Sequence, residues 1–506
     1  MRWYWLLPFL FATSRTLSLL AHNSGQAQFA DALPALLFLI SATALAYPVL
    51  SWIMRAGDKA ALVLSAFWLV CFSYDHFVQF AAVRPRIILL IYLVVISGPA
   101  VLLYRTRADL TKLCAVVFIF GLVQFATPLA RVAIYSVSQR GAKTVVTFPD
   151  EPDLARTDLA SDSRPDIYYI ILDRYADAGT LRERYGYDNA TFLAYLEKRK
   201  FFVAGDSRAN YICTSQSLAS SLNLAYINFL TDAMGTRSNN WLPLFEMMKD
   251  YRVWRFLKEE GYEFVHFGPR WAPTTTNPHA DKNFYYHRFS EFTTMLWETT
   301  MFYPIMHRFG LLDLRREKWE RVTRQFEWLS EIPERSDRPV FVFAHFLVPH
   351  NPYVFNTDGS FVNGATANER GRDANYLNQL TYVNTLVREL VDKLLDPDSS
   401  GTSPIIIIQG DEGTYPLRTT PIDFDWRTAT SEEVSQKVRI LNAIHAPLAY
   451  DSLYDGLTPV NTFRIIFNTY FGTRLARLPD RSYSYRDVEH LYDFFDVTEQ
   501  INAVRH

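Results

Sequence analysis

Three acids and two histidines follow short apolar runs whose composition is typical of buried strands. They are Asp173 after run 166–172, His345 and His350 after run 340–344, and Asp411 and Glu412 after run 405–408. In an open α/β sheet, functional residues gather where parallel strands end, at their carboxyl edge. Carboxylate oxygens and imidazole nitrogens are common metal ligands. The order of these residues therefore predicts a metal-dependent site at one edge of a sheet.

A candidate nucleophile lies in segment 210–222, which begins in turn-like residues and continues in small and apolar residues suited to a helix. Thr214 is therefore expected near a helix N-terminus, where exposed backbone N–H groups favour an anionic phosphate or sulfate. A neighbouring divalent cation would lower the pKa of its hydroxyl and make it a nucleophile. Ser215 and Cys213 are rival nucleophiles, and Thr214 could instead be a simple N-cap.

Each of the other candidates also has a purely structural interpretation. Asp173 could cap a strand end, and Asp411 could belong to a common Gly-Asp turn. His350, between two prolines, could be a surface histidine, and His345 could pack at the end of its strand. Glu412 could be a solvated acid in the turn. The arrangement of these side chains in the folded chain distinguishes the alternatives.

The elements that must position these residues alternate as in an α/β domain. Short, near-continuous apolar runs are typical of strands buried on both faces of a parallel sheet. Such runs occupy 166–173, 262–267, 340–344 and 405–408. Apolar residues at helical spacing occupy 242–260, 312–331 and 374–395. Strands that alternate with helices predict an α/β fold with a mainly parallel central sheet.

Five apolar runs precede residue 140, and about twenty apolar residues suffice to span a bilayer. The runs are 3–21, 32–54, 60–82, 86–104 and 112–136. Arg15 interrupts the first run, which lacks a clear small-residue cleavage site, so an uncleaved span is favoured over a signal peptide. Asp75 and His76 lie inside the third run, where ionisable residues are either functional or close to the membrane interface. We predict a transmembrane domain of about five helices over residues 1–136.

The charge distribution separates this membrane part from the rest of the chain. Residues 1–145 carry twelve Lys and Arg against four Asp and Glu, a net charge of +8, whereas the remainder has a net charge of −10. Neither part has the basic stripe of a nucleic-acid-binding protein. Residues 137–165 are polar and contain three prolines, which predicts a linker. With five spans, Lys and Arg in the short loops place residues 166–506 outside the cytoplasm, whereas an even number of spans would leave them in the cytoplasm.

The order of these motifs resembles that of a known enzyme family. Asp173 after a strand, Thr214 at a helix start, Pro-His350-x-Pro and Gly-Asp411-x-Gly resemble the sulfatase-like branch of the alkaline phosphatase superfamily. The order of membrane part and soluble part is similar to that of lipoteichoic-acid synthases and phosphoethanolamine transferases. The resemblance covers about residues 166–485 and implies an alkaline phosphatase-like fold.

The resemblance also implies a set of metal ligands. Asp173 and Asp411 would bind the ion, and Thr214 would be both a ligand and the nucleophile that forms a covalent phospho-enzyme. The family usually has histidine where this chain has Glu412, which would then be a carboxylate ligand. Such an all-oxygen set favours Mn or Mg, with Ca or Zn as alternatives, for one divalent ion. Cys213 lacks the Pro and Arg of the Cys-x-Pro-x-Arg motif that formylglycine formation normally needs.

The resemblance finally implies a reaction and a location. His350, with His345 as the second choice, would contact the oxygens of the transferred group. The expected enzyme transfers a phosphoglycerol- or phosphoethanolamine-like head group from a membrane lipid to an envelope glycan or lipid. The alternatives are a phosphodiesterase or sulfatase, or a non-catalytic envelope-assembly protein if Glu412 impairs metal binding. The expected location is the bacterial inner membrane, with several spans and an extracytoplasmic C-terminal domain.

Overall fold

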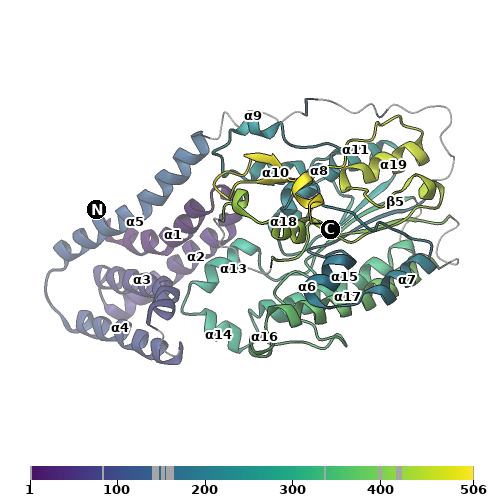
Figure 1. Cartoon of the computed structure of the whole chain (residues 1–506). Coiled ribbons are helices and arrows are strands. Elements are labelled where there is room, and N and C mark those ends of the chain that lie inside the picture. The colour runs from purple at the N-terminus through teal and green to yellow at the C-terminus, as the bar shows by residue number, and fades with distance from the viewer. Residues whose placement is uncertain are drawn as a thin grey trace. The chain divides into compact units, whose positions relative to one another are not determined.

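The chain forms two compact units in the computed structural model (Figure 1). The model describes residues 3–81, 85–138, 148–149, 154, 164–334, 338–396, 402–416 and 424–504. The helical unit comprises Met1–Thr144 and Arg288–Asp313, and the α/β unit comprises Val145–His287 and Leu314–His506. The predicted linker, 137–165, lies almost entirely outside the described residues.

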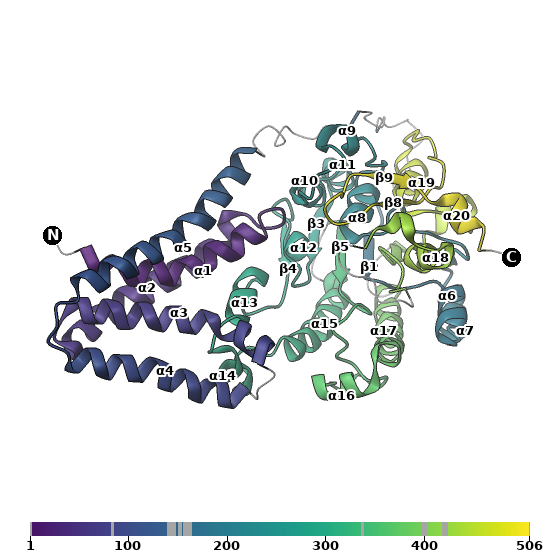
Figure 2. The same ribbon diagram turned by 60° about the vertical axis from the view of Figure 1, so that its left-hand side comes forward.

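Helices occupy all five predicted apolar runs, and α1, α3 and α5 run side by side (Figure 2). They are α1 (Leu7–His22, preceded by the 3-10 helix η1, Trp3–Leu6), α2 (Phe29–Met54), α3 (Gly57–Ala81), α4 (Pro85–Arg105) and α5 (Thr111–Ser138). By length and composition, α2 to α5 can each cross a membrane, whereas α1 has only 16 residues. Exposed apolar side chains such as Leu90, Leu102 and Ile134 are typical of lipid-facing helices. The predicted multi-span helical part is thus confirmed, with four spans by this criterion.

A short segment that the sequence assigned to the soluble domain belongs to the helical unit. It contains α13 (Glu291–Glu298) and α14 (Tyr303–Arg308). The indole of Trp297 packs edge-on against Phe38 of α2, with ring centroids 5.5 Å apart. The backbone N–H of Met301 donates to the carbonyl oxygen of Cys71 in α3 at 3.0 Å. The chain therefore leaves the α/β unit after its fourth strand and packs against the membrane-type helices before it returns.

The α/β unit is built on a seven-stranded, mainly parallel sheet. Its strands are β1 (Ile167–Leu172), β2 (Phe202–Val203), β3 (Glu263–Phe267), β4 (Lys282–Phe284), β5 (Val340–Phe346), β6 (Ile405–Gln409) and β7 (Asn442–His445). Their order is β2-β7-β6-β1-β5-β3-β4. The strands from β6 to β4 are parallel, and β7 is antiparallel to both of its neighbours, β6 and β2. A separate hairpin pairs β8 (Tyr483–Tyr485) with β9 (Phe494–Asp496). The predicted fold class is confirmed.

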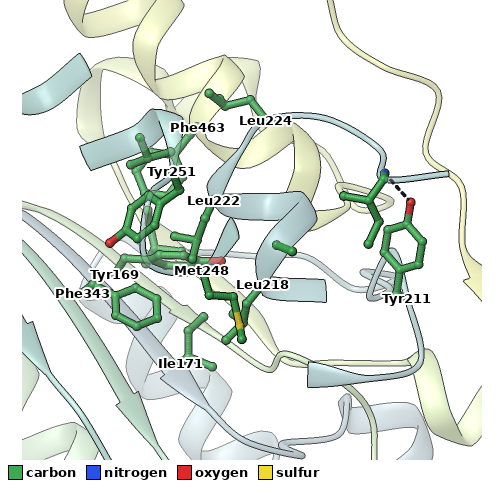
Figure 3. Close-up of a cluster of buried hydrophobic side chains, with 14 of the residues drawn as sticks. Tyr169, Ile171, Tyr211, Leu218, Leu222, Leu224, Met248, Tyr251, Phe343 and Phe463 are labelled. Carbon is green, nitrogen blue, oxygen red and sulfur yellow. Dashed lines mark hydrogen bonds between the residues drawn. The ribbon is translucent and has the colours of Figure 1, made fainter. Parts of the chain in front are cut away.

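Helices cover both faces of this sheet, because alternate residues of each strand belong to different apolar cores. Tyr169 and Ile171 of β1 pack with Leu222 of α8 in one core (Figure 3), whereas Tyr168 and Ile170 pack in the other. The first core includes α8 (Thr214–Leu222), α10 (Leu242–Met247), α11 (Arg252–Glu259), α18 (Ser431–Val438), α19 (Pro459–Phe471) and α20 (Thr498–Asn502). The second includes α6 (Ala178–Tyr185), α7 (Ala190–Lys198), α15 (Leu314–Ser330) and α17 (Arg372–Leu394). Shorter helices are α9 (Leu230–Met234), α12 (Ala272–Thr275), α16 (Gly364–Arg370), η2 (Ile332–Glu334), η3 (Trp426–Thr428) and η4 (Pro447–Ser452).

The strand register fixes which residues meet at the carboxyl edge of the sheet. Ile171 of β1 lies beside His345 of β5 on one side and beside Gln409 of β6 on the other. The residues that follow β1 and β6 are therefore delivered to the same edge as the end of β5.

Candidate metal centre and nucleophile

Three of the predicted side chains converge at this edge. Asp173 follows β1, His345 is the sixth residue of β5, and Asp411 lies two residues after β6. Each is at most 3% exposed. One ligand atom from each lies within 4.8 Å of the other two. The strand ends thus bring two carboxylates and one imidazole to a single buried point.

The unpaired atoms of this cluster fit a divalent cation. Asp173 Oδ1, His345 Nε2 and Asp411 Oδ2 are each buried without a hydrogen-bond partner among the described residues. Leaving such atoms unsatisfied costs about 1–3 kcal/mol each, and more for a charged group. A metal ion would satisfy all three at once. Two carboxylate oxygens and one imidazole nitrogen are ligands that Zn and Mn both accept, so the donor set does not select one metal.

Neighbouring groups orient the three side chains. Thr274 of α12 places its hydroxyl 2.9 Å from His345 Nδ1, and donation from the Nδ1–H to this oxygen leaves the Nε2 lone pair facing the two acids. The backbone N–H of Arg174 donates to Asp411 Oδ1 at 3.0 Å. The backbone N–H of Asp173 donates to the Phe346 carbonyl oxygen at 3.0 Å. The side chains of His345 and Asp411 are therefore each held by a second contact, and Asp173 is held through its backbone.

The two carboxylates are electrostatically unequal. Burial raises the pKa of Asp411 well above its usual range, and the charges of Asp173 and Glu412 raise it further. Burial opposes ionisation of Asp173 too, but His350, His345 and Arg174 outweigh this effect and lower its pKa below the usual range. Without a cation, the cluster therefore holds one negative charge readily and a second one only at an energetic cost. A bound cation would remove that cost.

Glu412 does not join the cluster, contrary to the prediction that it replaces a histidine ligand. Its Oε1 lies 2.7 Å from the Arg174 guanidinium and its Oε2 lies 2.5 Å from the Lys437 ammonium. All three side chains are shielded from solvent, so removing Glu412 from either cation would leave a buried charge unpaired. Its carboxylate neutralises two cations beside the site, and the nitrogen donor of the cluster comes from His345 instead.

Two glycines allow the loop after β6 to adopt this position. A Cβ atom on Gly410 would lie 2.6 Å from the carbonyl oxygen of Tyr175, and one on Gly413 would lie 2.2 Å from that of Gln436. Both distances are shorter than any real Cβ contact, so only glycine fits. The N–H groups of both glycines donate to the strand-and-helix segment 437–441, at 2.8 and 2.7 Å. The loop is clamped on both sides of Asp411 and Glu412.

Thr214 is the hydroxyl that the structure brings to the cluster. It is the first residue of α8 and is partly exposed, and its hydroxyl lies near the Asp411 carboxylate, whose pKa it acts to lower. Ser215 is 1% exposed. Burial raises the pKa of Cys213 to about 11, so its thiol stays protonated at neutral pH. Of the three rival nucleophiles, Thr214 combines partial exposure with a position near a candidate metal ligand.

His350 lies beside the cluster and is linked to it through the backbone. Its N–H donates to the carbonyl oxygen of Asp173 at 3.2 Å, and its Nε2 lies 3.1 Å from the Tyr415 hydroxyl. Burial lowers its pKa to about 4, so the ring is neutral at neutral pH. Lys318 of α15 donates from Nζ to the His350 carbonyl oxygen at 2.6 Å. The loop is thereby anchored to both β1 and α15.

Several residues around the site carry no sequence signal. Arg174 forms an ion pair with Glu412. Its guanidinium lies over the Tyr415 ring, with the guanidinium carbon 3.8 Å from the ring centroid. Lys437 reaches Glu412 from α18. Only the position of Arg174, directly after a predicted metal ligand, could have drawn attention to it.

No family model matches the sequence, and no curated protein matches it. Solved structures with a similar fold include the C-terminal periplasmic domain of EptC from Escherichia coli in complex with Zn, at 11% identity and a TM-score of 0.43, covering 64% of this chain and 87% of that one. The periplasmic domain of phosphoethanolamine transferase EptC from Campylobacter jejuni matches at 14% identity and a TM-score of 0.35, covering 63% and 93%. The integral membrane protein lipooligosaccharide phosphoethanolamine transferase A from Neisseria meningitidis matches at 11% identity and a TM-score of 0.38, covering 92% and 95%. At these values the likeness does not by itself assign a function to the chain.

Proposed function

We propose that this chain is a membrane-anchored, metal-dependent enzyme that transfers a phospho-head group through a covalent intermediate on Thr214. The observation that carries the proposal is the position of Thr214, at the start of α8 and near Asp411, a member of the buried Asp-His-Asp cluster. The sequence resemblance to phosphoethanolamine transferases and lipoteichoic-acid synthases points to the same reaction class.

Asp173, His345 and Asp411 would hold the divalent ion. When bound, the ion would stabilise negative charge on the Thr214 oxygen and on the transferred group. Thr214 would attack the phosphorus of a lipid phosphodiester, and the bond from phosphorus to the lipid oxygen would break. An acceptor hydroxyl would then attack the phospho-Thr214 and release the threonine oxygen, which regains a proton. In the first step the lipid oxygen would take up the proton that Thr214 loses, and in the second step Thr214 would take up the proton of the acceptor hydroxyl, so atoms and charges balance.

Other groups of the chain would bind the head group rather than react. The first backbone N–H groups of α8 surround Thr214 and favour phosphate oxygens. His350 is neutral and its ring nitrogens face the Asn351 carbonyl oxygen and the Tyr415 hydroxyl, so it would bind an oxygen of the transferred group by exchanging one of these hydrogen bonds. The apolar helices α2 to α5 would keep the enzyme at the membrane that contains the donor lipid. The acceptor would be an envelope glycan or lipid.

The test uses the full chain in lipid nanodiscs after chelation and reloading with Mn or Zn. Wild type is expected to bind about one ion, cleave a phosphodiester analogue that releases p-nitrophenol, and show a head-group mass on the peptide containing Thr214. Thr214→Ala is expected to lose both turnover and the adduct, whereas Ser215→Ala, the matched neighbour, keeps them. Turnover that survives in Thr214→Ala would refute the proposed nucleophile. A wild type that forms the adduct but passes it only to water would be a hydrolase.

A further inference from the structure

Arg174 has a buried hydrogen-bond donor without an acceptor directly beside the metal cluster. Its Nε is buried without a hydrogen-bond partner among the described residues and lies 3.9 Å from Asp173 Oδ1. The unpaired atoms of Asp173, His345 and Asp411 carry lone pairs, which a cation would satisfy. A cation cannot satisfy an N–H donor, so the Arg174 Nε needs an acceptor of its own.

The guanidinium of Arg174 is held by two neighbouring side chains. Its Nη2 lies 2.7 Å from Glu412 Oε1. One of its faces lies over the Tyr415 ring, with the guanidinium carbon 3.8 Å from the ring centroid. The Tyr415 hydroxyl in turn donates to Asn351 Oδ1 at 2.7 Å, which holds the ring in place. These contacts restrict rotation of the arginine side chain, so the position of its Nε is set before a ligand binds.

The backbone of Arg174 adopts an uncommon conformation that keeps the residue next to the cluster. Its φ of 64° lies in the left-handed region, which few residues other than glycine adopt. The turn follows β1 directly, because the Tyr175 N–H donates to the Leu172 carbonyl oxygen at 3.1 Å. The Arg174 N–H donates to Asp411 Oδ1 at 3.0 Å. Arg174 thus contacts a candidate metal ligand through its backbone, and such strained positions are concentrated at functional sites.

A phosphate oxygen is an acceptor that fits the free Nε. Asp173 does not serve, because its Oδ1 is itself unpaired at 3.9 Å from the Nε. Arginine binds phosphate through the N–H groups of its planar guanidinium, and these bonds are strengthened by charge. A phosphodiester has two unesterified oxygens, so one can face the metal cluster while the other accepts a hydrogen bond from Arg174. The side chain of Arg174 is 15% exposed, so a bound group can reach it.

We propose that Arg174 binds an unesterified oxygen of the transferred phospho group through its Nε, with its guanidinium held by Glu412 and Tyr415. The inference rests on the proposed function and adds to it a residue that contacts the substrate. The alternative is that Arg174 only neutralises the buried charge of Glu412, in which case replacing it by another cation should leave substrate binding unchanged.

The test is calorimetric titration of the Zn-loaded full chain in nanodiscs with methyl p-nitrophenyl phosphate, in a Thr214→Ala background that cannot form the adduct. Arg174→Lys keeps a cation for Glu412 but has no Nε. It is expected to weaken binding of this probe about 10- to 100-fold, as for one lost hydrogen bond to a charged group. With Thr214 present, kcat/KM for the probe should fall by the same factor. The melting temperature and the Zn affinity should stay unchanged. Arg184→Lys is the matched control, because Arg184 Nε is also buried without a partner but its guanidinium pairs with Asp373.

Two results would overturn this inference and leave the proposed function intact. Unchanged probe affinity in Arg174→Lys would show that the arginine only neutralises Glu412, and an equal loss in Arg184→Lys would show an unspecific effect. If Arg174→Lys fails to fold, the structure of the Zn-loaded Thr214→Ala chain with the probe decides. An Arg174 Nε about 2.7–2.9 Å from a probe oxygen supports the inference, and an Nε outside hydrogen-bond distance overturns it. A chain that binds neither Zn nor the probe would refute the proposed function, and this inference with it.

Discussion

Neutralising one carboxylate of the Asp-His-Asp cluster should stabilise the metal-free chain, whereas neutralising the other should destabilise it. Asp411 and Asp173 have ligand oxygens within 4.8 Å of each other. At an effective dielectric constant of about 20, two unit charges at that distance repel by about 3.5 kcal/mol. Asp411→Asn removes this repulsion, keeps the side-chain volume and still accepts from the Arg174 N–H. Asp173→Asn relieves the same repulsion, but it removes a carboxylate whose lowered pKa shows that the folded chain favours its charged form, with Arg174 beside it.

The sign of each effect follows from the pKa shifts. Asp411 has a folded pKa above its unfolded value, so the folded state loses stability as pH rises from the unfolded pKa near 4 toward the folded one. Asp173 has a lowered pKa, so its stabilisation is present above the unfolded pKa and is lost as pH falls. Partial protonation of Asp411 already relieves part of the repulsion. At pH 7 we therefore expect Asp411→Asn to gain about 2 kcal/mol rather than the full Coulomb energy.

The assay is thermal unfolding of the full chain in detergent and chelator at pH 7. For a unit of this size, 2 kcal/mol corresponds to a rise in melting temperature of about 3 °C. Asp173→Asn should melt lower than wild type. Adding Mn or Zn should raise the melting temperature of wild type but of neither variant, because binding to the folded state alone stabilises it. If Asp411→Asn melts at or below wild type in chelator, the two acids do not repel each other and the cluster is not a cation site.

Three further predictions concern the groups around the cluster. Thr274→Val removes the acceptor for His345 Nδ1 and should weaken metal binding about 10- to 100-fold without unfolding the chain, as measured by competition with a chromogenic chelator. Glu412→Gln leaves two buried cations without their shared partner and should lower the free energy of unfolding by about 3–5 kcal/mol, and an unchanged melting temperature would disprove the buried triad. His350 has a folded pKa of about 4, below its unfolded value near 6.5, so stability should fall as pH drops from 6.5 to 4. His350→Gln should reduce that loss in a pH series of melting temperatures, whereas an unchanged pH profile would contradict it.

The sequence alone predicted those elements whose pattern lies in neighbouring residues of the chain. Strand-end position alone identified Asp173 and Asp411, because parallel strands with matched register must deliver their last residues to one edge. The break in the expected helix 242–260 could not be predicted, because it depends on a distant contact. Tyr251 is extended and buried, packing 6.3 Å from the Phe343 ring, and α10 and α11 flank it as separate helices.

The partner of Glu412 could not be predicted for the same reason. Lys437 lies 25 residues further along, and its ammonium meets Glu412 only because α18 packs beside the loop after β6. Sequence spacing identified an acid next to a metal ligand but not whether that acid faces an ion or a lysine. The segment with α13 and α14 likewise shows neither the length nor the hydropathy of a span, so its place in the helical unit comes from tertiary contacts alone.

The distribution of buried charge around Glu412 would make the proposed site compatible with a phosphate group. Glu412 is outnumbered by Arg174 and Lys437, so this triad has a formal net charge of +1. Fully ionised, Asp173 and Asp411 contribute −2, which leaves a net charge of −1 in the absence of a cation and +1 with one divalent ion. A phosphodiester carries a single negative charge and complements the latter state only. Glu412 thus reduces the positive charge of the two basic residues. Binding of a metal ion would then change the site from one that repels a phosphodiester to one that attracts it.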